Sequence, residues 1–174
     1  MKKIYVLFSL LIVSLSVNAA PALKVKSGNW LSLLSEDANV CVEFDYSNAT
    51  WEEEESYEKF CGDTYKARTE TSVKDFISSF NNFSSCLKMA NTIEGAEYKM
   101  IFRIKNLERK QGMSMWGRFY IRIYGEIEII KISSNESVCS ILVNGHAGGD
   151  DVAPDDRLSK CFKALAEKLI KLKK

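Results

Sequence analysis

The segment Phe119–Ile130 alternates apolar and polar side chains, and this pattern limits the fold more than any other feature of the chain. Phenylalanine or isoleucine occupies positions 119, 121, 123, 127 and 129, whereas tyrosine, arginine and glutamate occupy the positions between them. Successive side chains of a strand point to opposite faces, so this period of two predicts a long strand with one buried face and one solvated face. Gly125 interrupts the apolar row and marks either a bulge or a close crossing of a helix.

Other segments complete the predicted fold. The period of two recurs over Val40–Tyr46 and Tyr98–Lys105, which are therefore predicted strands. Val138–Val143 is predicted to form a hairpin with Phe119–Ile130. Leu23–Gly28 is predicted to be a short strand. A helical pattern with a break at Gly62 covers residues 56–87, and a final apolar stripe follows Asp155 and Asp156, which are suitable N-caps. The sequence therefore predicts an α+β fold: a largely antiparallel sheet of about five strands, in the order β-β-α-β-β-β-α, with two helices packed on one face. The acidic run at 52–55 is interpreted as a solvated helix N-terminus.

The N-terminus has the pattern of a secretory signal peptide. Two lysines precede the apolar stretch Ile4–Val17, and Ala19 offers a small residue for cleavage. The apolar stretch is shorter than the roughly 20 residues that cross a bilayer. We therefore expect residues 1–19 to be removed and residues 20–174 to form a single domain, periplasmic or secreted, with no transmembrane segment in the mature protein.

Charge and cysteine content restrict the classes of partner. The 24 basic and 23 acidic residues nearly balance, so the chain lacks the basic surface that nucleic acid requires. No Cys-x-x-Cys motif supports a redox or zinc site, and no cofactor or metal is predicted. An oxidising compartment permits disulfides. The number of cysteines is odd, however, and their spacing assigns no pairing. The alternative for Cys139 and Cys161 is that they are buried free thiols. The five cysteines are Cys41, Cys61, Cys86, Cys139 and Cys161.

Two groups of residues carry functional hypotheses. Trp116, Tyr120, Arg122 and Tyr124 could form an aromatic and basic surface for a ligand or partner, because interfaces favour tryptophan, tyrosine and arginine. The alternative for this group is ordinary decoration of an exposed sheet face with cross-strand pairs.

The second group is a glycine-rich loop that holds His146, the only histidine, with Asp150 and Asp151. These residues could form a hydrolytic dyad or a cation site. No nucleophile motif accompanies them, and their spacing differs from that of a calcium loop. Glycine and aspartate also serve simply to turn the chain from a strand into a helix.

Lys24-Val25-Lys26-Ser27-Gly28 is followed in the chain by Val40-Cys41-Val42-Glu43-Phe44-Asp45-Tyr46-Ser47. These residues resemble the opening of a family of small exported proteins of Bacteroidetes-type bacteria, and the resemblance covers most of the mature chain. The segments 145–150 and 155–172 look like the glycine-rich loop and final helix of that family. The resemblance implies export and a similar fold, and it implies no catalytic residue. This chain departs from the pattern in its five cysteines and in its acidic segment at Glu52.

These observations favour an exported, non-catalytic binding or accessory module whose partner is an envelope protein, a glycan or a lipid component. The alternative is a small hydrolase or metal-dependent enzyme that uses the loop of His146, Asp150 and Asp151. A third interpretation is a secreted effector or inhibitor. Whether the chain is an enzyme is left open by the sequence.

Overall fold

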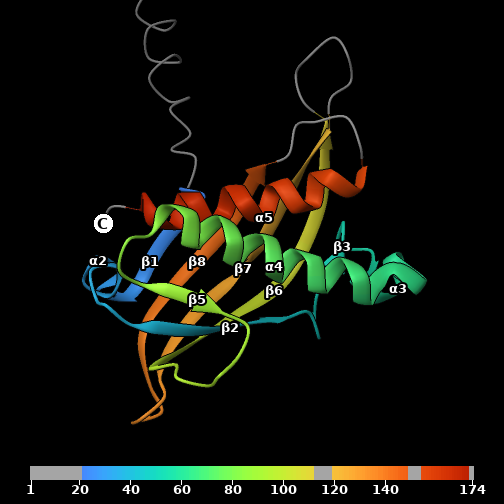
Figure 1. Ribbon diagram of the computed structural model, residues 1–174. Helices are drawn as coiled ribbons and strands as arrows, with labels where there is room; N and C mark the ends of the chain where they lie inside the picture. The colour runs from blue at the N-terminus through green and yellow to red at the C-terminus, as the bar shows by residue number, and fades with distance from the viewer. Residues whose placement is uncertain (1–20, 112–118, 149–153, 173–174) are drawn as a thin grey trace, which may run out of the picture.

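The computed structural model describes residues 21–111, 119–148 and 154–172 (Figure 1). The elements, in chain order, are β1 (Leu23–Gly28), α2 (Trp30–Leu34), β2 (Asn39–Asp45), β3 (Thr50–Trp51), β4 (Glu55–Ser56), α3 (Tyr57–Cys61), the 3₁₀ turn η1 (Gly62–Thr64), α4 (Tyr65–Phe83), β5 (Lys88–Ala90), β6 (Tyr98–Gln111), β7 (Phe119–Lys131), β8 (Glu136–Gly148) and α5 (Pro154–Ile170). The alternating segments predicted from the sequence are confirmed as the strands β2, β6, β7 and β8. The predicted helical interruption at Gly62 is also confirmed, as η1 between α3 and α4.

The prediction of a largely antiparallel sheet of about five strands with two helices is wrong, both in the sheet and in the helices, because the short helices α2 and α3 accompany α4 and α5. The described strands form a mixed sheet of eight, with the main order β1-β8-β7-β6-β2-β5, in which β3 pairs with β6 and with β4. Strands β1, β8, β7 and β6 are antiparallel neighbours, whereas β2 lies parallel to both β6 and β5. Parallel neighbours require a crossover connection, and α4 provides it between β2 and β5. Alternation within a strand does not specify the direction of its neighbour, which explains the error.

The acidic run forms a hairpin turn, and its interpretation as a helix N-terminus is wrong. The Glu54 N–H donates to the carbonyl oxygen of Trp51 at 3.1 Å, which closes a tight turn between β3 and β4. Glu52 and Glu53, the two central residues of this turn, have φ angles of 54° and 62°, left-handed values that residues other than glycine adopt uncommonly. Helix α3 begins only after Ser56, whose hydroxyl accepts a hydrogen bond from the Lys59 N–H.

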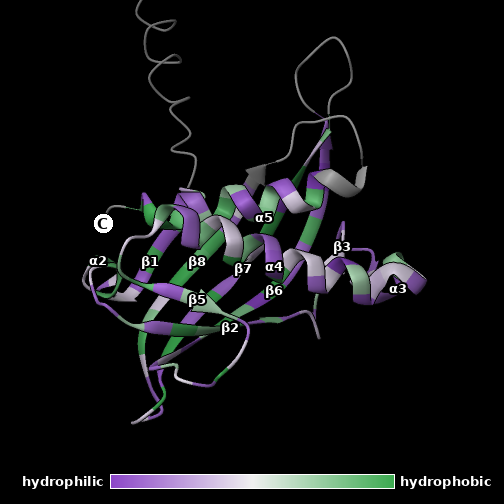
Figure 2. Ribbon diagram, in the orientation of Figure 1, coloured by the Kyte–Doolittle hydropathy of each residue, from purple (hydrophilic) through white to green (hydrophobic). Residues whose placement is uncertain are grey.

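The core lies between the sheet and the pair of helices α4 and α5, which run side by side over one face of the sheet (Figure 1). Apolar residues recur along the strands beneath these helices, and α5 alternates apolar and polar residues (Figure 2). Four phenylalanine rings, from two strands and both helices, meet in this core. The centroid of the Phe44 ring lies 5.2 to 5.3 Å from the centroids of Phe76, Phe102 and Phe162. The period of two therefore buries one face of each strand, as the sequence predicted.

The opposite face of the sheet carries ion pairs between strands, one of them across β8 from β1 to β7 and one between the neighbours β6 and β7. Lys26 lies 3.1 Å from Glu126, and Arg103 lies 2.7 Å from Glu128, measured between the charged atoms.

Gly125 marks a bulge, as one of the two alternatives predicted: the register of β6 with β7 shifts between Ile104 and Asn106, directly opposite this glycine. Within the described ranges, no helix is both long enough and apolar enough to span a membrane.

Candidate functional site

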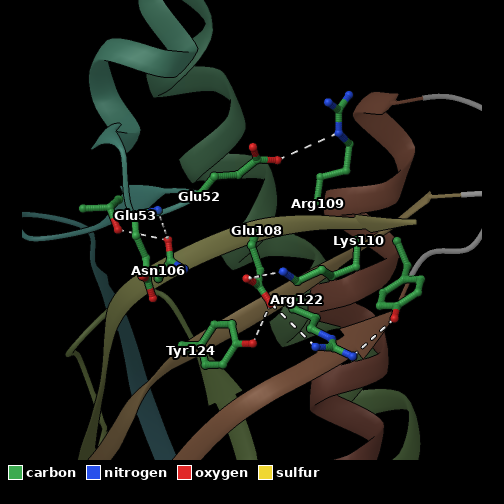
Figure 3. Close-up of polar contacts among 10 residues, drawn as sticks. Glu52, Glu53, Asn106, Glu108, Arg109, Lys110, Arg122 and Tyr124 are labelled. Atoms are coloured by element: carbon green, nitrogen blue, oxygen red, sulfur yellow. Dashed lines mark hydrogen bonds and ion pairs between the residues drawn. The ribbon is translucent and has the colours of Figure 1, made fainter. Parts of the chain in front are cut away.

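The candidate site lies on the polar face of the sheet, towards the C-terminal end of β6 and the N-terminal end of β7 (Figure 3). The register pairs Asn106 with Tyr124 and Glu108 with Arg122. Because alternate residues share a face, positions 106, 108 and 110 of β6 lie beside positions 120, 122 and 124 of β7. The polar face of the two strands thus brings several ionisable and aromatic side chains together on one surface.

Glu108 is the centre of this surface. The Tyr124 hydroxyl donates a 2.6 Å hydrogen bond to its Oε1, and Lys110 Nζ lies 3.1 Å from its Oε2 (Figure 3). Arg122 Nη1 lies 3.7 Å from Oε1, on the same carboxylate. The side chain of Glu108 is only 14% exposed, so solvent screens these interactions less than on an open surface. Burial raises the pKa of Tyr124, and its hydrogen bond to Glu108 raises it further, so the phenol remains a proton donor at neutral pH.

Arg122 and Tyr124 are also supported from other directions. Arg122 donates a 3.3 Å hydrogen bond to the hydroxyl of Tyr120, and its guanidinium lies 5.6 Å from the centroid of the Tyr120 ring. Gly145 on β8 approaches the ring of Tyr124 so closely that an added Cβ would lie 3.1 Å from it. The φ of Gly145 is +67°, a backbone conformation that glycine adopts easily. The side chains of this surface are therefore held in place by contacts within the chain.

The acidic turn between β3 and β4 is attached to the same end of β6. The Oδ1 of Asn106 accepts hydrogen bonds from the Glu53 N–H at 3.1 Å and from the Thr50 hydroxyl at 3.0 Å. The Glu52 N–H donates to the carbonyl oxygen of Leu107 at 2.8 Å. A hollow of about 320 Å³ lies between the turn and β6, and it is lined by Glu52, Glu53, Glu54, Glu108, Arg109 and Lys110. These contacts fix the acidic turn beside Glu108.

The acidic residues of the hollow do not form a metal site. Within residues 21–111, 119–148 and 154–172, no three histidine, cysteine, aspartate or glutamate side chains are placed to hold a metal ion. Arg109 and Lys110 also line the hollow, and Arg109 Nε lies 3.9 Å from Glu52 Oε1. The hollow therefore offers cationic hydrogen-bond donors on Arg109 and Lys110 and anionic acceptors on its glutamates.

His146 is a buried residue of the core face. It pairs with Ile123, which is fully buried, and its own exposed fraction is 6%. Burial lowers the pKa of the imidazole to about 4, with a smaller contribution from Lys168 on α5. The ring is therefore neutral at physiological pH, and its Nε2 has no hydrogen-bond partner among the described residues. Asp150 and Asp151, the other members of the predicted loop site, lie outside the described residues.

The five cysteines lie within the described ranges, and the structure joins none of them in a disulfide. Cys41, Cys61, Cys139 and Cys161 are buried, and Cys86 is half-buried. Burial raises the pKa of the Cys139 thiol to about 11, which keeps it protonated. The Cys161 thiol donates to the carbonyl oxygen of Ile121 at 3.3 Å, between α5 and β7.

The structure brings together three of the four residues proposed for a binding surface. Tyr120, Arg122 and Tyr124 lie on one face of β7, and Trp116 lies outside the described residues. Glu108, which holds this group, and Asn106, which holds the acidic turn, were not predicted as site residues from the sequence. The period of two in β6 places both on the polar face, but the identification of their partners requires the register between β6 and β7.

No protein-family model and no curated protein sequence matches this chain. Among solved structures, the chain is similar to the PelC dodecamer from Paraburkholderia phytofirmans, with 13% identity and a TM-score of 0.47 over 84% of this chain and 97% of that one. A variant of the same dodecamer in a second crystal form gives 14% identity and a TM-score of 0.46, over 87% and 98% of the two chains. Similarity at this level concerns the course of the backbone and says nothing of what this chain binds.

Proposed function

We propose that this chain is an exported, non-catalytic module of the bacterial envelope that binds a protein partner through the Glu108 surface, defined as Glu108, Lys110, Tyr120, Arg122 and Tyr124. The observation that carries the proposal is the carboxylate of Glu108, which holds Tyr124 and places Arg122 and Lys110 around it. Tyrosine and arginine dominate the energetics of protein interfaces. Fixing them in advance lowers the conformational entropy that binding would otherwise remove.

The chemistry of the surface favours a protein over a lipid component. Its side chains combine both charges with two phenols, and aliphatic residues are not among them. A lipid surface would be recognised by exposed apolar or purely basic groups. The flat face of a sheet also suits an extended partner surface better than a small molecule, which requires a concave site.

The observed placement of His146 favours binding over catalysis. The imidazole lies on the core face of β8, opposite the polar face that carries Glu108. A general base must reach the proton that it removes, and a neutral ring packed between β8 and α5 is not placed for this task. The proposal of export depends on the signal-peptide pattern of residues 1–19 and on the resemblance to small exported proteins.

The proposal is tested by photo-crosslinking in the native host. A photoreactive phenylalanine analogue replaces Tyr120, and a matched control places the same analogue at Ser140, on the same sheet face but away from the Glu108 surface. We expect a single envelope protein to crosslink from position 120. Arg122→Gln or Tyr124→Phe should reduce the yield at least tenfold, whereas Arg103→Gln, which breaks a distant ion pair on this face, should leave it unchanged.

Two results would contradict the proposal. The first is a crosslink that persists at full yield in both Arg122→Gln and Tyr124→Phe. The second is equal adducts from positions 120 and 140, which would indicate nonspecific contact. N-terminal sequencing of the protein recovered from the cell envelope tests export separately, and we expect it to begin at Ala20.

A further inference from the structure

The two edges of the sheet differ in whether their outer backbone groups are bonded. The order of the main sheet places β1 at one edge and β5 at the other (Figure 1). An edge strand has N–H and C=O groups on its outer side that no neighbouring strand pairs, so it can accept a further strand from another chain. Whether an edge is open therefore depends on what else in the chain bonds to these groups.

The β5 edge is closed by a side chain of α4. Lys88 faces the β2 side, because its N–H donates to the carbonyl oxygen of Ala38 at 2.9 Å. Met89, the next residue, faces outward, and its N–H donates to Asn81 Oδ1 at 2.8 Å. The Nδ2 of the same amide donates to the carbonyl oxygen of Met89 at 2.8 Å. An added strand would have to displace Asn81, so this edge is closed to pairing.

The β1 edge is open. The Asn144 N–H donates to the carbonyl oxygen of Ala22 at 2.9 Å, so Ala22 faces β8. Bonded and non-bonded pairs alternate along an antiparallel ladder. Lys24 therefore also faces β8, and Leu23 and Val25 direct their N–H and C=O groups away from it. Within the described part of the chain, no turn, loop or side chain bonds to these outer groups.

A groove follows this open edge. It has a volume of about 400 Å³ and is lined by every residue of β1, by Pro21 and by Leu172, which lies just beyond α5. Val25 and Leu172 are half-buried and pack against the core, so they form an apolar side of the groove. Because a whole strand lines it, this hollow, called here the β1 groove, suits an extended segment that adds to the sheet.

Lys24 gives the groove an unpaired positive charge. Its side chain is exposed and makes no ion pair or hydrogen bond with the described residues. Lys26, two residues later, is already engaged, because its Nζ lies 3.1 Å from Glu126. Opposite charges on neighbouring strands stabilise their pairing. An acidic side chain beside Lys24 would therefore gain a partner without breaking an existing ion pair.

The same charge disfavours a second copy of this chain as the occupant. If two copies paired antiparallel through the outer groups of both Leu23 and Val25, Lys24 of one copy would lie directly opposite Lys24 of the other. Like charges directly opposite each other destabilise a pair of strands. Lysine on an edge strand protects against such self-association. The occupant that fits the edge is thus a different chain with acidic residues.

We propose that the β1 groove binds an extended segment of another protein in which acidic and apolar residues alternate. The segment lies beside β1 and bonds its backbone to the outer groups of Leu23 and Val25. Successive side chains of a strand point to opposite faces, so its apolar residues pack beside Val25 and Leu172 and its acidic residues lie beside Lys24. The proposal does not depend on the Glu108 surface, none of whose residues lines the groove.

The test uses the mature protein and two synthetic peptides with blocked ends, each as long as β1. One peptide alternates glutamate with valine, and the other alternates lysine with valine. NMR of the backbone amides gives both the affinities and the rates of hydrogen exchange. The glutamate peptide should bind at least tenfold more tightly than the lysine peptide. It should also slow exchange at the Val25 amide at least tenfold, whereas the Lys24 amide, which faces β8, is protected in the free protein as well.

Substitutions separate the backbone contribution from that of the charge. Val25→Pro removes an outer N–H without removing a bond to β8, so it should weaken the glutamate peptide at least tenfold. Val25→Ala is its control, because it shortens the side chain but keeps the donor, and it should weaken binding less. Lys24→Glu should reverse the preference between the two peptides. Lys66→Glu, the same charge change on α4, should leave both affinities unchanged.

Three results would overturn the proposal. They are equal affinities of the two peptides for the wild type, a bound state in which the Val25 amide exchanges as fast as in the free protein, and no binding of the glutamate peptide at millimolar concentration. If Val25→Pro folds poorly, Lys24→Glu and the exchange rate at Val25 still decide the question. None of these results bears on crosslinking from position 120, so the two proposals fail independently.

Discussion

The burial of His146 makes a prediction about acid stability that also tests its exclusion from catalysis. The imidazole has a pKa of about 4 in the folded protein, against an ordinary value of 6.5, because it is buried. The unfolded chain therefore binds the proton more tightly, and acid favours unfolding. The stabilisation by the neutral ring is fully present above pH 6.5 and is lost as the pH falls towards 4.

The magnitude follows from the two pKa values. A difference of one in pKa corresponds to about 1.4 kcal/mol. Between pH 7.5 and pH 5, proton binding to the unfolded chain alone should lower the free energy of unfolding by about 2 kcal/mol. The carboxylates of Glu126 and Glu128, whose pKa values are lowered by hydrogen bonds to Lys26 and Arg103, contribute mainly below this range.

Urea denaturation of the wild type and of His146→Gln, at pH 7.5 and pH 5, provides the assay. Glutamine does not titrate, so the wild type should lose about 2 kcal/mol more than the variant over this range. NMR titration of the imidazole gives the pKa directly. Equal losses in the two proteins, or an imidazole pKa near 6.5, would refute the placement of His146 in the core and reopen its candidacy as a general base.

Two further substitutions test the packing of the sheet and helices. Gly125→Ala would place a Cβ 2.4 Å from the carbonyl oxygen of Arg103, so we expect a loss of about 1–3 kcal/mol in urea denaturation, and an unchanged midpoint would show that the β6 bulge absorbs the extra atom. Trp30→Phe removes the 2.7 Å hydrogen bond from the indole to the carbonyl oxygen of Leu169 and should cost about 1–3 kcal/mol, with faster hydrogen exchange at the end of α5. Exchange in α5 at the wild-type rate would contradict the role of this bond in holding the helix.

The binding surface shows how far local patterns reach. Tyr120, Arg122 and Tyr124 share a face of one strand because they are alternate residues, so the sequence of β7 alone predicts that they lie together. Glu108 was missed because its contact with Tyr124 spans two strands. The pairing of their residues depends on the bulge between Ile104 and Asn106, which shifts the register by one residue.

The position of Trp51 lies still further from what local patterns show. Trp51 directly precedes the acidic run, where the sequence predicts a helix N-terminus. The turn at Glu52 and Glu53 instead returns the chain beside β3 as β4, and Trp51 stacks on Phe60 of α3. Two consecutive glutamates with positive φ are unfavourable as an isolated turn, so the contacts of Asn106 and Leu107 must hold them there.

The sequence by itself determined the long strands and the two main helices, because the periods of 2 and 3.6 residues record which side of each element is buried. Only the tertiary structure decided that β2 lies parallel to β6 and that eight strands form one mixed sheet. It also decided that the acidic run forms the turn between β3 and β4, and that Arg68, Arg109 and Arg157, which are far apart in the sequence, line one pocket. The physical reason is that burial is recorded residue by residue, whereas the choice of neighbour depends on how all the elements pack at once.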